Sequence, residues 1–194
     1  MEKTNIAVFA SGTGSNFETI VKAMEAGRLD CNVSLLVCDK ADAKVLDKAK
    51  AFNIPTFVFN PKDYDSKADF EQEIITQLEA KQIEWIVLAG YMRLIGTTLL
   101  SQFESKIINI HPSLLPSFPG KDAIGQALEA GVKITGVTIH YVDEGMDTGK
   151  IIEQEALRVR EKEDRDSLQQ RIQELEHRLF PETIQRLVSN NLEK

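Results

Sequence analysis

The amino-acid sequence predicts an α/β protein built on a doubly wound, mostly parallel sheet of about seven strands with an antiparallel carboxyl-terminal part. Two observations favour this class. Over the first 120 residues, short and nearly continuous apolar runs alternate with longer amphipathic segments, as in parallel sheets that helices cover on both faces. After residue 120, two β-like runs follow each other across a turn-rich loop, which is typical of an antiparallel pair.

The elements follow from these patterns in chain order. Apolar runs predict strands at residues 5–10, 33–38, 56–59, 85–89 and 107–110. Apolar spacings of three and four predict helices at residues 15–26, 44–52, 67–81 and 97–103. A helix at 122–130 and strands at 134–141 and 151–159 are expected next. We expect the final amphipathic helix, 166–190, to be interrupted near Pro181, because proline removes a helical hydrogen bond.

Composition predicts one globular domain. The chain has 194 residues, of which 42% are hydrophobic and 27% charged. It has no apolar run of about 18 residues and no signal-peptide pattern, so we expect a cytoplasmic protein without a membrane partner. The net charge of −7 opposes nucleic-acid binding. Cys31 and Cys38 lie in or beside an apolar run and are predicted to be reduced packing residues, and the sparse, unpaired His and Cys residues predict no metal.

The most informative stretch for function is residues 109–116. Asn109 and His111 are two positions apart at the end of an apolar strand, so their side chains should point to the same face. A neutral amide beside an imidazole suits a reaction in which a carbonyl oxygen gains charge and a proton moves. The prolines that follow end the strand, and they make the Leu115–Pro116 peptide a candidate for cis geometry.

A glycine-containing loop, Ser11-Gly-Thr-Gly-Ser-Asn16, joins the first strand to the first helix. Unpaired N–H groups at a helix amino terminus favour phosphate binding, although a tight turn with a Ser or Asn cap is the simpler alternative. Asp39 follows the second strand, as the ribose-binding acid of dinucleotide enzymes does. However, Phe17 stands where that fingerprint needs its third glycine, so a monophosphate fits better.

Two further segments have the composition of a ligand site. Residues 88–95 lack polar turn residues, and their backbone and apolar side chains suit a flat heterocycle, with plain core packing as the alternative. In the acidic loop 142–149, Asp147 is placed to orient His111 and favour its charged form, unless the loop is a solvated turn. We expect His140 to be structural. Because these segments should all leave carboxyl ends of strands, we expect them to converge on one enzymatic crevice.

Taken as a set, five motifs resemble the folate-dependent phosphoribosylglycinamide formyltransferases of purine biosynthesis over nearly the whole length. They are SGTGSN (11–16), LAGYMRLI (88–95), INIHPSLLPSFPG (108–120), GVTIHYVDEGMDTG (136–149) and LEH (175–177). The resemblance implies a formyltransferase-like variant of the Rossmann fold in one domain, 1–194. Residues 1–105 would form its mononucleotide-binding half, and residues 106–194, with the last helix, its catalytic and folate-binding half.

The resemblance also assigns roles. Asn109, His111 and Asp147 are the implied catalytic trio. The implied contacts of glycinamide ribonucleotide are Gly14, Ser15, Asn16, Phe17, Gln173 and Glu176. Those of the folate are Lys67, Met92, Arg93, Leu94, Ile95, Asn109, Asp143, Glu144, Gly145, Met146 and Asp147. Thr13 and Lys150 depart from the residues common at these positions in the family.

The implied reaction is transfer of the formyl group of 10-formyltetrahydrofolate, a co-substrate, to the amine of 5′-phosphoribosylglycinamide. The amine attacks directly, and Asn109 and His111 stabilise the tetrahedral intermediate with help from Asp147. The partners are therefore small molecules, with a homodimer left open. Rival hypotheses are a formyltetrahydrofolate hydrolase, a methionyl-tRNA formyltransferase, and a non-catalytic nucleotide-binding module of the same fold. Length and the charge of −7 argue against the tRNA enzyme, which would need a basic carboxyl-terminal module.

Overall fold

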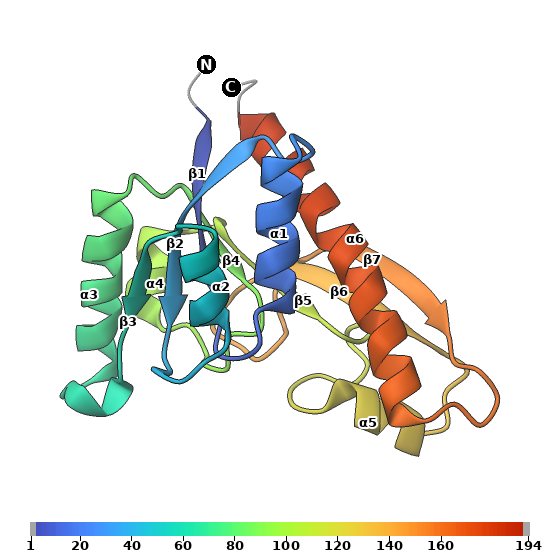
Figure 1. The fold of residues 1–194 in the computed structure, drawn as a ribbon. Coiled ribbons are helices and arrows are strands. Elements are labelled where there is room, and N and C mark those ends of the chain that lie inside the picture. The colour runs from blue at the N-terminus through green and yellow to red at the C-terminus, as the bar shows by residue number, and fades with distance from the viewer. Residues whose placement is uncertain (1–2, 192–194) are drawn as a thin grey trace.

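The centre of the structure is a seven-stranded mixed sheet with the strand order β3-β2-β1-β4-β5-β6-β7. A computed structural model describes residues 3–191, and Figure 1 shows the fold. The strands are β1 (Thr4–Phe9), β2 (Cys31–Cys38), β3 (Thr56–Val58), β4 (Trp85–Leu88), β5 (Ile107–His111), β6 (Ile134–Tyr141) and β7 (Ile151–Arg158). β1 to β5 are parallel, while β6 and β7 are each antiparallel to the preceding strand. The predicted fold class is confirmed.

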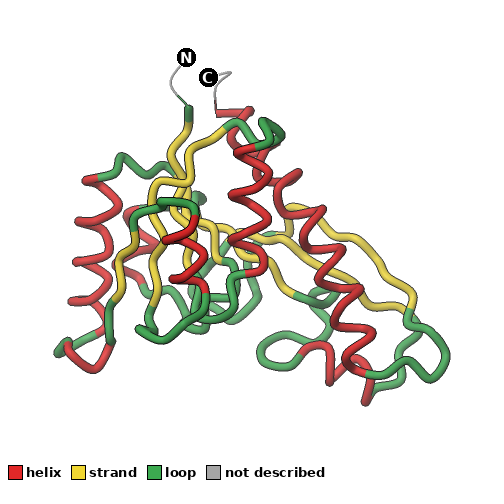
Figure 2. The backbone as a smooth tube through the Cα atoms, in the orientation of Figure 1, coloured by secondary structure: helices red, strands yellow, loops and turns green. Residues whose placement is uncertain are grey.

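Helices cover both faces of the sheet, as buried parallel strands require. They are α1 (Ser15–Glu25), α2 (Val45–Ala51), α3 (Lys67–Ala80), α4 (Thr97–Gln102), α5 (Ala123–Glu129) and α6 (Arg165–Asn191), with a short 3₁₀ turn η1 (Pro61–Asp63). Figure 2 shows α1, α2 and α6 crossing in front of the strands. Successive residues of β1 point to opposite faces of the sheet. Ile6 and Val8 pack with α1, α2 and α6 on one face, whereas Ala7 and Phe9 pack with α3 and α4 on the other.

The chain reverses its winding direction at β1, which pairs with β2 on one side and β4 on the other. Phe9 is aligned with Leu88 of β4, and Leu88 with Asn109 of β5. The carboxyl ends of three strands therefore lie at one level, next to the switch point where open α/β sheets bind ligands.

The last helix corrects one prediction. We expected an interruption near Pro181, but α6 is one helix of 27 residues with Pro181 inside it. Proline leaves the carbonyl of His177 without its usual donor, yet Phe180, Ile184 and Val188 continue the buried stripe past it. Burial of this stripe against α1 and β6 outweighs the one lost hydrogen bond.

Cys31 and Cys38 are buried and form no disulfide, as predicted. Burial raises the pKa of Cys31 to about 12. The Leu115–Pro116 peptide is cis. Within residues 3–191, no helix combines the length and apolarity needed to cross a membrane, and no cluster of His, Cys, Asp or Glu there could hold a metal ion.

Candidate functional site

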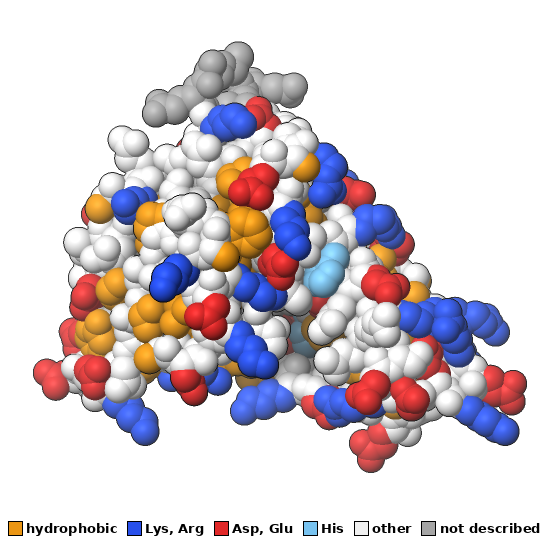
Figure 3. Space-filling model, in the orientation of Figure 1, with side chains coloured by type: hydrophobic (Ala, Val, Ile, Leu, Met, Phe, Trp, Pro, Cys, Tyr) orange, Lys and Arg blue, Asp and Glu red, His pale blue; other side chains and the backbone are white. Residues whose placement is uncertain are grey.

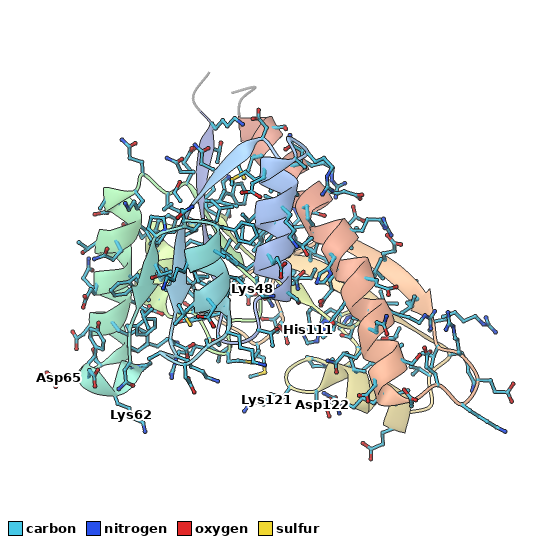
Figure 4. All side chains as sticks on the ribbon, viewed as in Figure 1. Lys48, Lys62, Asp65, His111, Lys121 and Asp122 are labelled. Carbon is cyan, nitrogen blue, oxygen red and sulfur yellow. The ribbon has the colours of Figure 1, made fainter. Side chains whose placement is uncertain are left out.

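A cleft of about 650 Å³ lies where the parallel strands end, between the sheet and helices α5 and α6. Figure 3 shows the surface hollowed at this place, and Figure 4 labels His111 beside it. Its walls come from the glycine loop, residues 88–95, the end of β5, residues 120–124, the loop 142–147, and three side chains of α6, those of Arg165, Gln173 and Glu176. The predicted convergence of distant segments on one crevice therefore exists in the structure.

The start of α1 forms one part of the cleft wall. Gly14 precedes the helix with φ 73°, and a Cβ placed there would lie 2.4 Å from Cγ2 of Val45, so this position requires glycine. No side chain caps the helix, which removes the simpler alternative of a Ser or Asn cap. The first-turn N–H groups have no helical partner and lie at the positive end of the helix dipole, an arrangement that attracts a phosphate.

Glu176 lies beside this loop on α6 and is buried. Nδ2 of Asn16 donates a hydrogen bond to Oε2 of Glu176 across 3.2 Å, while Oδ1 of Asn16 is buried without a partner among the described residues. Burial raises the pKa of Glu176 to about 7, and the bond from Asn16 offsets only part of this effect. An uncommitted amide oxygen and a carboxyl group of raised pKa are both available to a polar ligand.

Asn109, His111 and Asp147 meet in the middle of the cleft. Nδ1 of His111 is 3.4 Å from Oδ2 of Asp147, and Nε2 of His111 is 2.8 Å from the Phe118 carbonyl. The Phe118 carbonyl is an acceptor, so Nε2 of His111 donates to it, and Nδ1 faces the Asp147 carboxylate. His111 is held in one orientation by these two contacts.

His140 is a site residue that sequence reasoning missed, since we expected it to be structural. Its Nδ1 donates to the Tyr141 carbonyl across 2.8 Å, and its Nε2 lies 3.3 Å from Nδ2 of Asn109 and 3.6 Å from Oδ1 of Asp147. The ring is hydrogen-bonded, as a structural histidine would be, but it also lines the cleft. The pairing of β5 with β6 brings it there: His140 lies opposite Asn109 in this antiparallel pair, so both point to the same face, and no sequence pattern gave that register.

Asp147 reaches the site by a route that differs from the prediction. β6 is antiparallel to β5, so its carboxyl end lies beside Ile108 rather than at the carboxyl edge of the parallel strands. The loop 142–150 folds back across the face of the sheet to bring Asp147 to the two histidines. Burial by itself would raise the pKa of Asp147, but hydrogen bonds from His140 and the Gly120 N–H, with attraction to His111, hold it below its usual value.

Another wall of the cleft is open and apolar. Met92, Leu94 and Met146 have exposed fractions of 68%, 49% and 50%, high values for large apolar side chains. Ile95 is buried, so it supports this wall from behind, although its surface still lines the cleft. Asp143 and Gly145 complete this wall. The alternative that segment 92–95 only packs in the hydrophobic core is wrong for Met92 and Leu94, because both are exposed.

Three residues implied by the resemblance lie outside the cleft lining. The side chain of Phe17 is fully buried in the core, because α1 packs it against the sheet, so only its N–H group can reach a ligand. Lys67 is exposed at the start of α3, beside Gly96, and Glu144 is exposed in the β6–β7 loop. Of the two departures, Thr13 lines the cleft, whereas Lys150 is exposed and its carbonyl pairs with the Tyr141 N–H.

Comparison with known proteins agrees with this architecture. The chain matches the formyl transferase family over residues 4–184. It is 57% identical over 185 residues to the phosphoribosylglycinamide formyltransferase of Bacillus subtilis (strain 168), covering 95% of both chains. It is 41% identical over 187 residues to the trifunctional purine biosynthetic protein adenosine-3 of Gallus gallus, covering 96% of this chain and 19% of that protein. Glycinamide ribonucleotide transformylase 1 from Geobacillus kaustophilus superposes with a TM-score of 0.94 at 57% identity, covering 96% of this chain and 100% of that one. The chain belongs to the formyl transferase family.

Proposed function

We propose that this formyl-transferring enzyme moves the formyl group of 10-formyltetrahydrofolate to the amine of 5′-phosphoribosylglycinamide in purine biosynthesis. The observation that carries the proposal is the set of groups that line the cleft. The start of α1, which is suited to a phosphate, an open apolar wall, and the side chains of Asn109, His111 and Asp147 all line this one cleft. A nucleotide amine and a formyl donor bound at the two walls would meet at these three side chains.

The polar wall suits the ribonucleotide. The N–H groups at the start of α1 would bind its phosphate. Asn16, Gln173 and Glu176 line the adjoining wall and offer amide and carboxyl groups to the ribose hydroxyls and the glycinamide. Because Glu176 is buried and bonded to Asn16, a ligand that replaces this contact must supply hydrogen-bonding groups of its own.

The open wall suits the folate, which supplies the formyl group. Met92, Leu94 and Met146 offer apolar surface to a flat ring system. The N–H groups of Arg93, Leu94 and Ile95 have no protein partner among residues 3–191, so they remain available to a heterocycle.

The central side chains suit direct attack of the amine on the formyl carbon. As the formyl oxygen takes up negative charge, Nδ2 of Asn109 would donate a hydrogen bond to it. The Nδ1–H of a protonated His111, which faces Asp147 at 3.4 Å in the free protein, would turn to donate a second one, and each donor would contribute on the order of 10² to 10³ in rate. Asp147 would keep His111 oriented and help a bound water carry the proton from the attacking amine to the folate nitrogen. The bond between that nitrogen and the formyl carbon then breaks as the intermediate collapses, which leaves the formyl group on the amine and releases tetrahydrofolate. The geometry uses no activated Ser or Cys nucleophile, so no covalent enzyme intermediate is invoked.

One assay tests the proposal. Purified protein is supplied with 5′-phosphoribosylglycinamide and 10-formyltetrahydrofolate, and both products are quantified. We expect formyl on the amine in equal amount to the folate released. Formate without formylated amine would instead identify a hydrolase, and absence of both products would identify a non-catalytic nucleotide-binding module.

A further inference from the structure

Two buried carboxylates lie at the two ends of segment 90–96, which follows β4 and forms the open wall of the cleft. Asp39 follows β2 and its side chain is 2% exposed; Glu71 belongs to α3 and is 3% exposed. Neither residue lines the cleft. Burying a carboxylate is costly unless it is fully hydrogen-bonded or paired, so the partners of these two groups indicate what each one holds in place.

Asp39 fixes the start of the segment through Ser11 and Arg93. Its Oδ1 accepts a hydrogen bond from Oγ of Ser11 at 2.5 Å, and its Oδ2 accepts from Nε of Arg93 at 2.7 Å. The Ser11 hydroxyl in turn accepts from the Met92 N–H at 3.0 Å. Because the Ser11 proton is committed to Asp39, a lone pair of the hydroxyl is turned toward Met92.

Glu71 fixes the end of the segment. Its two oxygens accept hydrogen bonds from the N–H groups of Gly96, at 2.6 Å, and Leu99, at 3.2 Å. Gly96 precedes α4 and has no side chain to cap it, so a carboxylate from α3 performs the capping. A Cβ at Gly96 would lie 2.7 Å from Oε2 of Glu71, which shows how closely the carboxylate packs on this backbone.

We propose that Asp39 and Glu71 are positioning residues that hold the two ends of segment 90–96. The N–H groups of Arg93, Leu94 and Ile95 between these two anchors then keep one geometry before the folate binds. Preorganisation of this kind raises affinity because no ordering cost is paid on binding. This inference rests on the proposed function in one respect, which is that the ligand of this wall is a folate. The anchoring itself is a property of the free protein.

The test combines amide hydrogen exchange with binding of tetrahydrofolate and of 5′-phosphoribosylglycinamide. The variants are Asp39→Asn and Glu71→Gln, which keep side-chain size. An amide at position 39 can accept from Ser11 or from Arg93 but not from both, because its second group is a donor. Asp30→Asn is the matched control, since Asp30 is exposed and pairs with Lys3 away from the cleft.

We expect faster exchange confined to residues 90–99 and about tenfold weaker tetrahydrofolate binding in both variants, with ribonucleotide affinity within about twofold of the original. If either variant fails to fold, Ser11→Ala, at a residue outside the cleft lining, removes the hydroxyl that joins Asp39 to the Met92 N–H, and faster exchange of the Met92 amide then tests the Asp39 anchor. Unchanged exchange in this segment, or equal weakening of both ligands, would overturn the anchoring. If the unaltered protein bound no tetrahydrofolate, the proposed function would fail while the exchange data still decided the anchoring.

Discussion

Two walls of the cleft are built in different ways. The wall proposed for the phosphate is made of main-chain N–H groups at the start of α1 and a buried carboxyl group, Glu176, so its geometry follows from a strand-turn-helix unit and one neighbouring helix. The open wall proposed for the folate is a loop with exposed Met92 and Leu94, and buried carboxylates from two other elements hold its path. The comparison teaches that one cleft can combine a wall shaped by a local backbone motif with a wall that depends on distant side chains for its shape.

The largest effect is expected at His111. His111→Ala should lower kcat by about 10²- to 10³-fold, because a charged donor to the formyl oxygen is lost, and leave affinity for both ligands almost unchanged. Steady-state kinetics and calorimetric binding measure this. His177→Asn is the control, since His177 lines a separate surface groove. Near-normal turnover of His111→Ala would remove this residue from the chemistry.

At the wall proposed for the phosphate, Glu176 should make stability depend on pH. Its pKa is about 7 in the folded protein and 4.5 ordinarily, so the folded state holds the extra proton and stability falls as pH rises from about 4.5 to 7, by on the order of 3 kcal/mol. Glu176→Gln should remove this fall, as urea unfolding at pH 5 and pH 8 would show. Glu174→Gln, an exposed neighbour on α6, should retain it. An identical pH profile in Glu176→Gln would contradict the assignment.

A substitution at Gly14 should distort the glycine loop before α1. Gly14→Ala should weaken ribonucleotide binding by tenfold or more, because both the positive φ and the contact with Val45 oppose a Cβ, and destabilise the protein by about 1–3 kcal/mol. Gly27→Ala is a close control: it has φ 70° and open space around it, so it carries the backbone cost without the collision. Equal losses in the two variants would show that the collision is unimportant.

The smallest effect is expected at the open wall. Met92→Ala should raise the KM for 10-formyltetrahydrofolate several-fold and leave the KM for the ribonucleotide unchanged, because an exposed apolar contact is lost only when the folate binds. Stability should change by less than about 0.5 kcal/mol. Val58→Ala, an exposed apolar position on the edge strand β3, is the control and should alter neither KM. A raised KM for the ribonucleotide in Met92→Ala would contradict the proposal that the two substrates contact different walls of the cleft.

Where sequence reasoning succeeded, the relevant geometry was local. Asn109 and His111 share a face because side chains alternate along any strand, and the glycine loop precedes a helix because the apolar periodicity changes there. Where it failed, the geometry was long-range. His140 was interpreted as structural because it alternates with Ile139 and Tyr141 inside a strand, and its neighbour Asn109 is 31 residues away in the sequence. The packing of the Phe17 side chain into the core was likewise visible only in the structure.

The sequence by itself determined the class of fold, the alternation of strands and helices, and the residue types of the site, because covalent geometry and hydrophobic periodicity act within a few residues. Only the tertiary structure decided that α6 continues through Pro181, that the loop 142–150 folds back to place Asp147, and that Asp39 and Glu71 anchor the open wall. Each of these depends on which groups, distant in the sequence, become buried together. A buried polar group is costly without a hydrogen-bond partner, so burial decides which contacts must form.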